Sequence, residues 1–263
     1  MNRIFPSVAV ALLAFAFGQG LAQAAPSDIV VSEDFESTPV GAIPQGFIKT
    51  GQIGVEEGVA HSGTHALKIE PAVKGGRFIT LAPDKVAALG GEHWGRLYYK
   101  VGTPAPSPAP QEGKKTPIIH ATFVAAKATS PLENDPIELR LAGLILNAAG
   151  DYRYLYNVQP RKRKEFGVHA KAAHQFNDEW TLIEWHVDYA SQTYQFFVNG
   201  EEVTDLALHK GAGQFEGAEI PPALQTLSIG WTNYQPASGA GFTVWIDDLA
   251  IGKTRLGPVL AAK

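Results

Sequence analysis

The sequence has no cysteine among its 263 residues. An exported chain of this size without disulfides depends for stability on its hydrophobic core, with or without the help of a bound metal ion. It also lacks a strong excess of charge, because the formal net charge is only -4. This weak acidic balance argues against a general nucleic-acid-binding protein.

Long apolar runs are missing after the first 24 residues, so we expect no membrane span. Those first residues contain Arg3, an apolar stretch from Val8 to Phe17 and the small-x-small ending Ala22-Gln23-Ala24. This is the pattern of a cleaved secretory signal. We therefore predict a signal peptide over residues 1–24 and a secreted or periplasmic mature chain, residues 25–263, that forms one domain.

Stretches with a helical period of 3.6 residues are also absent, whereas short alternating runs of Thr, Val, Ile and aromatic residues are frequent. Joined by turns at intervals of about ten to fifteen residues, such runs indicate an all-β sandwich of two sheets. The predicted strands are 77–81, 95–102, 118–125, 137–146, 151–159, 180–189, 193–200, 226–234 and 241–252.

The residues of three connections between strands predict their local structure. Asn199-Gly200 is suited to the positive-φ positions of a tight hairpin turn. Residues 82–91 predict one short helix, capped by Asp84 and ended by Gly90. The proline-rich stretch 103–117 predicts a loop within the domain, because proline removes donors from a sheet.

The basic run Arg161-Lys162-Arg163-Lys164 is the local exception to the acidic balance. Such a run is usually a solvated loop between strands. The alternative is a rim that attracts an acidic polymer.

Three segments far apart in the sequence share carboxylates or small polar residues beside a strand: "EDFES" (33–37), "AHSGTHALKI" (60–69) and "WIDDLAIG" (245–252). They would meet if the first and last strands pair. Each segment alone also has an ordinary explanation, as a solvated strand end or a turn.

Calcium takes six to eight oxygen ligands from carboxylates, carbonyls and hydroxyls, and a tight Ser-Gly turn exposes carbonyls. We therefore predict a structural Ca²⁺ ion held by Glu36 and Asp247, with carbonyl or hydroxyl oxygens from Ser62 and His65.

The chain resembles a family of secreted jelly rolls that includes fungal glucuronan lyase and the fungal cellulose-induced protein. The resemblance covers about residues 33 to 257. It rests on segments that recur in the same order, which are "EDFES", "VAHSGTHALKI", "HATF", "LR", "YN", "IEWH", "GWTNY" and "VWIDDLAIGKTRLG".

The resemblance implies a concanavalin-like β-jelly-roll sandwich with a concave sheet and a bound calcium ion. It supports Glu36, Ser62, His65 and Asp247 as the ligands. At the position of His65 the fungal relatives have asparagine, so a backbone carbonyl is the expected donor there. The chain departs from the lyases after "LR", because Ala142-Gly143-Leu144 stands where they carry glycine and glutamine.

Strand alternation selects the side chains of the predicted groove, because every second residue shares a face. His120 and Thr122 lie opposite an apolar set, and so do Glu138 and Arg140. Together, a histidine as base, a guanidinium to neutralise the carboxylate and a phenol as acid or base could catalyse β-elimination of a uronic acid. No cofactor is needed for that chemistry.

The predicted catalytic residues are His120 as base, Arg140 to neutralise the substrate carboxylate, and Tyr156 or Tyr234 to protonate the leaving oxygen or act as the base. His120 is also consistent with a hydrogen-bonded sheet residue.

The predicted substrate-binding residues are Glu138, Tyr154, Asn157 and Trp231. Three of them also have a structural explanation. Glu138 could form an ion pair with Arg140, and Tyr154 could be present because tyrosine packs well in strands. Trp231 shares the face of apolar neighbours, as a core residue would.

We expect a polysaccharide lyase whose partner is an acidic polysaccharide or oligosaccharide, without nucleic acid or membrane span, and monomeric. The alternatives are a non-catalytic carbohydrate-binding jelly-roll module and a glycan-independent envelope or matrix protein. A retaining hydrolase is disfavoured, because the spacing Glu-x-Asp-x-x-Glu occurs only over residues 133–138, where Glu133 and Asp135 precede the predicted strand 137–146 and so do not share a strand with Glu138.

Overall fold

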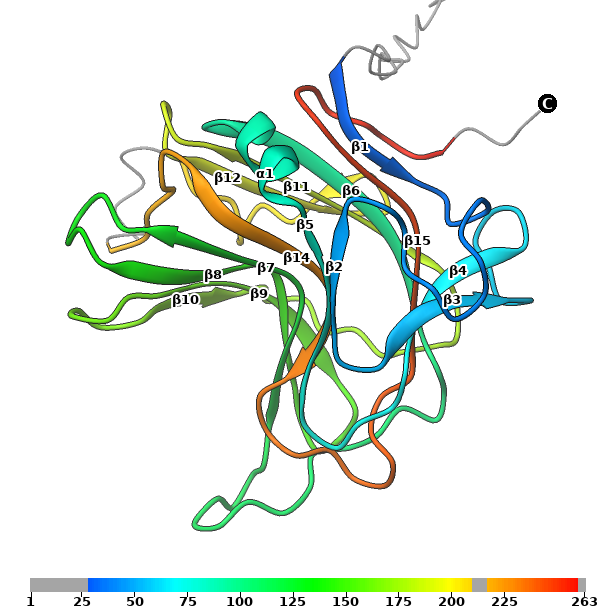
Figure 1. The fold of residues 1–263 in the computed structure, drawn as a ribbon. Coiled ribbons are helices and arrows are strands. Elements are labelled where there is room, and N and C mark those ends of the chain that lie inside the picture. The colour runs from blue at the N-terminus through cyan, green and yellow to red at the C-terminus, as the bar shows by residue number, and fades with distance from the viewer. Residues whose placement is uncertain (1–27, 210–216, 260–263) are drawn as a thin grey trace, which may run out of the picture.

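The computed structural model describes residues 28–209 and 217–259. Two antiparallel sheets enclose the core, and the one helix of these ranges, α1 (Pro83–Leu89), connects β5 to β6 (Figure 1). The signal peptide predicted over residues 1–24 lies outside the described residues. Within the described ranges no helix is long and apolar enough to cross a membrane.

The first sheet, called sheet A, contains both the first and the last strand of the described chain. The N-terminal strand β1 (Ile29–Glu33) pairs with residues Leu249–Gly252 of the last strand, β15 (Val244–Gly252). The other strands, in the order of the sheet, are β13 (Glu201–Glu202), β12 (Thr193–Val198), β11 (Thr181–Asp188), β6 (Glu92–Val101), β15 (Val244–Gly252), β4 (His65–Ile69) and β3 (Ile53–Glu57).

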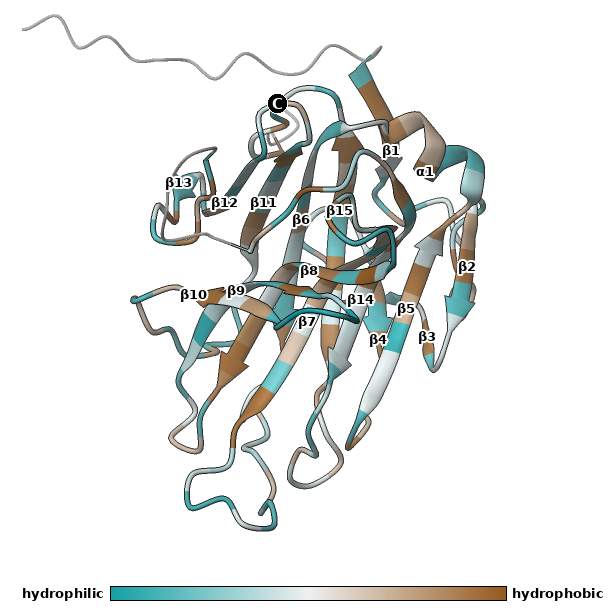
Figure 2. Cartoon of the chain, turned by 90° about the vertical axis from the view of Figure 1, so that its left-hand side faces the viewer, coloured by the Kyte–Doolittle hydropathy of each residue, from teal (hydrophilic) through white to brown (hydrophobic). Residues whose placement is uncertain are grey.

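The second sheet, called sheet B, carries the candidate site on its outer face. Its strands, in order, are β10 (Phe166–His169), β9 (Tyr152–Gln159), β8 (Pro136–Leu146), β7 (Ile119–Thr129), β14 (Leu224–Asn233), β5 (Gly75–Leu81) and β2 (Phe47–Thr50). Figure 2 shows apolar and polar residues alternating along several of these strands. The two-sheet β-sandwich predicted from the sequence is therefore confirmed.

The pairing of β1 with β15 brings the two ends of the described chain together, with Glu33 opposite Leu249. Figure 1 shows the blue first strand alongside the red last strand. This is the pairing on which the meeting of the three carboxylate-bearing segments depended.

The local predictions are confirmed with one exception. Asn199 and Gly200 have φ values of 50° and 85° and connect the paired strands β12 and β13, as a primed turn requires. The helix ends before Gly90, which has a φ of 59°. Asp84 is not its cap, because the N-cap is Ala82 and Asp84 lies in the first turn, where a carboxylate favours the helix dipole.

His93 of β6 is a histidine inside the core, with 1% of its surface exposed. Its Nε2 atom accepts a 3.2 Å hydrogen bond from the indole N–H of Trp185. Burial, with smaller contributions from the charges of His186 and Lys253, lowers the pKa of His93 to about 3. The imidazole is therefore neutral in the folded protein at physiological pH.

Acid should destabilise the protein through His93. The pKa is lower in the folded than in the unfolded chain, so between about pH 6.5 and pH 3 the unfolded chain binds the extra proton and stability falls as the pH falls. We expect a loss of about 2 kcal/mol between pH 6.5 and pH 5, measured by urea unfolding. His93→Gln, whose amide oxygen can accept the Trp185 hydrogen bond, should lose less. Equal losses in both proteins would contradict this assignment.

Candidate functional site

The outer face of sheet B carries the polar side chains that alternate with core residues. His120 comes from β7, Glu138 and Arg140 come from β8, and Asn157 comes from β9. Because β7 pairs with β8 and β8 pairs with β9, these residues lie on adjacent strands of one surface. The structure thus places His120 and Arg140 on the same face of the same sheet.

Arg140 is a buried cation whose charge is poorly compensated by the described residues. Its side chain is 5% exposed, and its Nε atom is buried without a hydrogen-bond partner among the described residues. The guanidinium carbon lies 3.9 Å from the centroid of the Tyr234 ring. Its ion-pair partner in the described chain is Glu138, at 4.0 Å between Oε1 and Nε. A buried charge with so little compensation favours an anion beside it.

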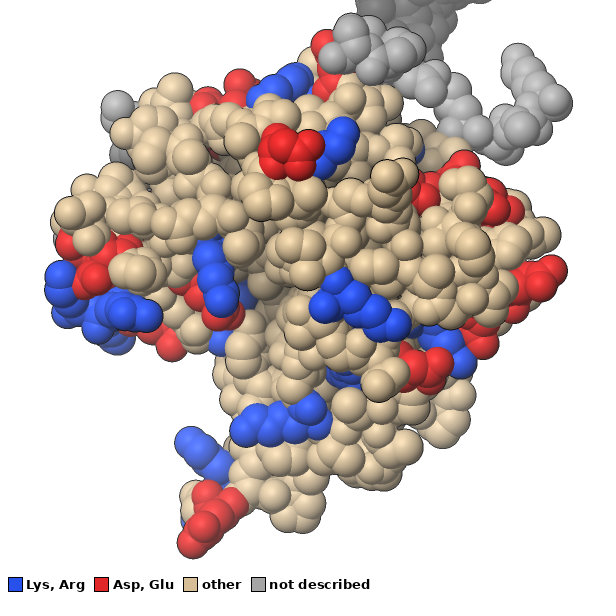
Figure 3. Space-filling view, viewed as in Figure 1, with Lys and Arg blue, Asp and Glu red and all other residues tan. Residues whose placement is uncertain are grey.

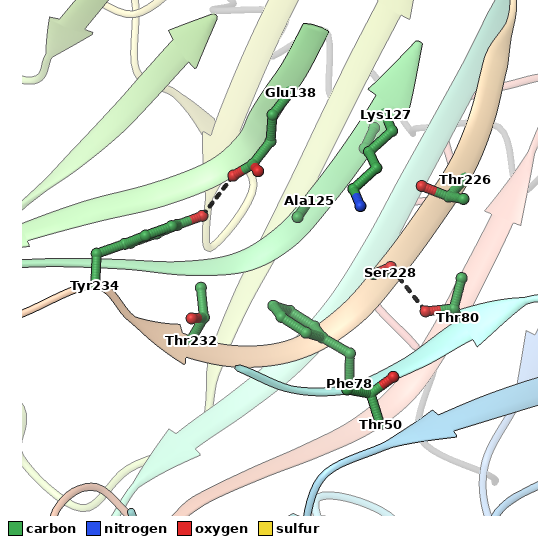
Figure 4. A pocket seen from close by; sticks show the side chains of 11 residues that line it. Thr50, Phe78, Thr80, Ala125, Lys127, Glu138, Thr226, Ser228, Thr232 and Tyr234 are labelled. Atoms are coloured by element: carbon green, nitrogen blue, oxygen red, sulfur yellow. Dashed lines mark hydrogen bonds between the residues drawn. The ribbon is translucent and has the colours of Figure 1, made fainter. Parts of the chain in front are cut away.

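Tyr234 follows β14 and reaches across the outer face toward β8. Its backbone N–H donates to the carbonyl of His120 at 2.9 Å. Its hydroxyl donates to Oε1 of Glu138 at 2.7 Å (Figure 4). Burial raises the pKa of Tyr234 to about 12, and the charge of Arg140 opposes this while that of Glu138 adds to it. The phenol therefore holds its proton at neutral pH and can act as an acid.

His120 lies half-buried beside the same groups. Its backbone N–H donates to the side-chain oxygen of Gln235 at 2.7 Å. Burial and then the positive charge of Arg140 lower the pKa of its imidazole, while Gln235 opposes the shift. The ring is therefore unprotonated at neutral pH, which is the state that a general base requires.

A hollow of about 330 Å³ opens beside Glu138 and Tyr234 (Figure 4). Its remaining lining was not predicted from the sequence, although Thr226, Ser228 and Thr232 stand at alternate positions of a predicted strand. The other lining residues are Thr50, Phe78, Thr80, Ala125, Ala126 and Lys127. Hydroxyls around the rings of Phe78 and Tyr234 and the ammonium group of Lys127 are suited to a hydrated, polar ligand such as a sugar.

Asn157 lies opposite Arg140 in the register of β8 and β9. Its amide nitrogen donates to Oε1 of Glu165 and to the carbonyl of Phe166, both at 2.7 Å. Its side-chain oxygen is buried and has no partner in the described chain. The outer face thus presents an unused acceptor from Asn157 and an unused donor from Arg140 on neighbouring strands.

Three predicted site residues lie in the core and not in the groove. Tyr154 is 1% exposed and its hydroxyl shares a 2.6 Å hydrogen bond with that of Tyr99. The Tyr156 hydroxyl donates to the carbonyl of Glu219 at 3.0 Å, and both Tyr156 and Trp231 are fully buried. The prediction that these side chains contact substrate is therefore corrected, because they face the opposite sheet.

The family model described as "Polysacc_lyase-like: Cip1-like, core domain" matches residues 34–254. The chain belongs to this Cip1-like, polysaccharide lyase-like family. The resemblance noted in the sequence is confirmed by this match.

Two solved structures are similar to this member of the Cip1-like family. Cellulose induced protein, Cip1, has a TM-score of 0.60 at 18% identity, with 87% of this chain and 100% of that chain covered. The receptor binding domain of botulinum neurotoxin mosaic serotype C/D has a TM-score of 0.51 at 11% identity, covering 88% and 48%. At these identities the likeness shows the fold alone. No curated protein matches the chain in sequence.

The turn of the Cip1-like chain that begins at His61 is held by hydrogen bonds to Asp247 on one side. One oxygen of Asp247 accepts hydrogen bonds from the backbone N–H groups of His61 at 2.7 Å and Ser62 at 3.1 Å. The neighbouring Asp248 accepts from the Ser62 hydroxyl at 3.0 Å and contacts Nδ1 of His61 at 2.6 Å. Burial, together with the charge of Asp248, raises the pKa of Asp247 to about 7 against the effect of the N–H donors.

Glu36 accepts hydrogen bonds from the other side of the turn. Its Oε1 atom accepts from the backbone N–H groups of Thr64 at 2.8 Å and His65 at 2.7 Å. Slight burial opposes the shift, but these bonds and those from the two side chains lower the pKa of Glu36 to about 2. Gly63 lies between the residues bonded to Asp247 and those bonded to Glu36. A Cβ atom at this position would lie 2.4 Å from Oε1 of Glu36, so a larger residue would clash with that carboxylate.

The donors at this turn partly fit the calcium ion that the family resemblance implies. The described chain contains no cluster of three or more acidic or histidine side chains suited to a metal. The adjacent buried carboxylates of Asp247 and Asp248 are hard, negatively charged donors that suit calcium. Asp247 and Glu36 both already accept hydrogen bonds from backbone N–H groups, so carbonyls such as those of Ser62 and His65 would have to complete a site.

The basic run 161–164 is partly neutralised within the Cip1-like chain. Figure 3 shows Lys and Arg side chains beside Asp and Glu side chains at the left-hand edge of the molecule, where Figure 1 shows the loops beside β8 and β10. Lys162 forms a 2.5 Å ion pair with Asp135, and Arg163 binds the buried carboxylate of Glu219. Arg163 Nε also lies 3.6 Å from Glu133. These contacts tie loops together at the edge of sheet B, which favours the structural interpretation for half of the run.

Proposed function

We propose that this protein is a secreted or periplasmic polysaccharide lyase that cleaves an acidic, uronic acid-containing glycan by β-elimination. The observation that carries the proposal is Arg140, a buried guanidinium on the outer face of sheet B whose Nε atom has no hydrogen-bonding acceptor among the described residues. A substrate carboxylate would provide the missing anion. Membership in a polysaccharide lyase-like family and a hollow lined with hydroxyls support the same conclusion.

The elimination can be assigned to residues on this face. The unprotonated imidazole of His120 takes the proton from the carbon next to the substrate carboxylate. Arg140 stabilises the charge that develops on that carboxylate. The electron pair of the broken C–H bond forms the new C=C bond, the adjacent C–O bond breaks, and Tyr234 gives its proton to the leaving oxygen.

The direct test is the ultraviolet absorbance of the unsaturated uronide product, followed with a panel of acidic polysaccharides. A rise in absorbance with one polymer supports the lyase. If no polymer gives the signal while several slow the protein in an affinity gel, the protein is a carbohydrate-binding module. If neither occurs, a glycan-independent envelope or matrix role gains support.

The binding-module alternative is favoured by the segment after Arg140. Where the related lyases carry glutamine near this position, Ala142-Gly143-Leu144 supplies no side-chain amide, and all three residues are buried. The site would then hold the glycan through Arg140 and the hollow without completing the reaction.

Replacing His120 by alanine is expected to reduce turnover on the order of 10²-fold or more, because general base catalysis typically contributes this much. The product absorbance measures the loss. His209→Ala, at an exposed histidine of sheet A's flank, is the matched control and should retain full activity. Unchanged turnover in His120→Ala, with the fold intact, would remove His120 from the mechanism.

We further propose that the turn between Glu36 and Asp247 binds calcium. A ligand at a hundred times its dissociation constant adds about 2.7 kcal/mol of stability. Chelation with EDTA should therefore lower the melting temperature by roughly 5 to 10 °C, and added calcium should restore it. An unchanged melting temperature and no metal in elemental analysis would contradict the calcium site.

A further inference from the structure

Glu138 lies at the hollow, and the elimination steps leave its role open. Its Oε1 atom accepts a 2.7 Å hydrogen bond from the Tyr234 hydroxyl. The same atom lies 4.0 Å from Nε of Arg140, beyond hydrogen-bonding distance. Figure 4 shows the two side chains of Glu138 and Tyr234 reaching toward each other at the rim of the hollow. The carboxylate is thus bonded to the phenol and not to the guanidinium.

Tyr234 is restrained at three points. Its backbone N–H binds the carbonyl of His120, and its ring lies over the guanidinium of Arg140. The third point is the hydroxyl, which donates a hydrogen bond to the carboxylate of Glu138. Without Glu138 the ring could still tilt about its side-chain torsions, and the hydroxyl would lose its fixed place.

The titratable groups around Tyr234 come from two neighbouring strands. Glu138 and Arg140 contact it from β8, while β7 supplies His120, whose carbonyl accepts its backbone N–H, and Lys127, which lines the same hollow. The side chains that β14, β5 and β2 contribute to the hollow carry no charge. Glu138 is therefore the negative group among the described neighbours, and a negative charge beside a phenol disfavours loss of its proton.

We propose that Glu138 is a positioning residue, which fixes the Tyr234 phenol beside Arg140 and keeps its proton in place until the leaving oxygen of the substrate becomes the acceptor. The inference rests on the proposed elimination. In the step itself, the O–H bond of Tyr234 breaks, the proton moves to the leaving oxygen, and the electron pair stays on the phenolate. Solvent then returns a proton to the phenolate.

Glu138 also lies near the guanidinium that would bind the substrate carboxylate, so its charge opposes that of the substrate. The hydrogen bond that Glu138 accepts and the negative charge that it carries therefore have separate kinetic effects. Removing the hydrogen bond should lower kcat, and removing the charge should lower KM for an acidic polymer.

The kinetic test compares Glu138→Ala and Glu138→Gln with the wild-type protein. Glu138→Ala loses the acceptor and should lower kcat on the order of 10-fold to 100-fold. Glu138→Gln keeps an acceptor oxygen but not the charge, so its KM should fall several-fold. Glu201→Gln, at an exposed glutamate of sheet A, is the matched control and should change neither. Wild-type kcat in Glu138→Ala overturns the inference.

A second measurement does not need activity. With 3-fluorotyrosine in place of tyrosine, the ¹⁹F resonance that is missing in Tyr234→Phe reports the titration of this phenol. It should titrate about one pH unit lower in Glu138→Gln than in the parent protein. An unchanged titration overturns the inference. If the wild-type protein cleaves no acidic polymer, the proposed function fails, and this titration still decides whether Glu138 controls the proton of Tyr234.

Discussion

Replacing Arg140 by glutamine is expected to reduce cleavage of the acidic glycan by about 10³-fold, because removing one group that stabilises developing negative charge typically costs 10²- to 10³-fold. The effect should be at the upper end, since Arg140 is buried, where charge interactions are strongest. The measurement is the initial rate of ultraviolet absorbance with the best polymer of the panel.

The fold should survive this substitution. Arg140 has no hydrogen-bonding partner among the described residues, so its removal leaves no buried acceptor unpaired. We therefore expect an unchanged or slightly raised melting temperature, as when a poorly compensated buried charge is removed. Arg140→Lys keeps the charge but loses the planar fork and should recover only part of the activity. Arg161→Gln, in the exposed basic run, should be fully active. Retention of more than about a tenth of the activity in Arg140→Gln would contradict the role of Arg140.

Alternation in the sequence was enough to place the outer-face residues of β7 and β8. His120 and Thr122 stand between Ile119, Ala121 and Phe123, which are fully buried. An apolar set on one side of a strand leaves little choice about which face is the core. The same alternation separates Glu138 and Arg140 from their apolar neighbours Ile137, Leu139 and Leu141, which are buried.

The tyrosines of β9 show where this argument fails. Alternation along residues 151–159 puts Tyr152, Tyr154 and Tyr156 on one face, but it does not say which face is buried. Tyrosine is suited to either, because it has an apolar ring and a polar end. Arg153 and Asn157 on the other face were the stronger signal, since charged and amide side chains seldom face a core. Weighing them would have placed the tyrosines inside.

The contacts that make up the site depend on pairings that are distant in sequence. Tyr234 and Glu138 are separated by 96 positions, and they meet because β7 lies between β14 and β8. Register shifts occur in both pairings, between Ile229 and Thr232 and between Thr122 and Val124. A single sequence gives no means of locating such shifts, so the direction in which Tyr234 reaches was not predictable.

Replacing Gly95 by alanine is expected to cost at least about 3 kcal/mol of unfolding free energy, the upper range for overpacking a core. Gly95 of β6 lies directly opposite Trp185 of β11. A Cβ atom at Gly95 would lie 2.0 Å from Cζ2 of the indole. The indole cannot move aside easily, because it is fully buried and its N–H is bonded to His93. Urea unfolding measures the loss, or a failure to obtain folded protein shows it directly.

Gly102→Ala provides the matched control for this close contact. A Cβ atom there would lie 3.4 Å from Cζ3 of Trp245, an ordinary van der Waals distance, so we expect a change close to zero. The cause can be tested further in a Trp185→Phe background, where the clashing ring atoms are absent. Gly95→Ala should then cost much less than in the wild-type protein, because the two positions are in contact and their effects are not additive. Strictly additive costs would show that the indole is not what excludes a side chain at Gly95.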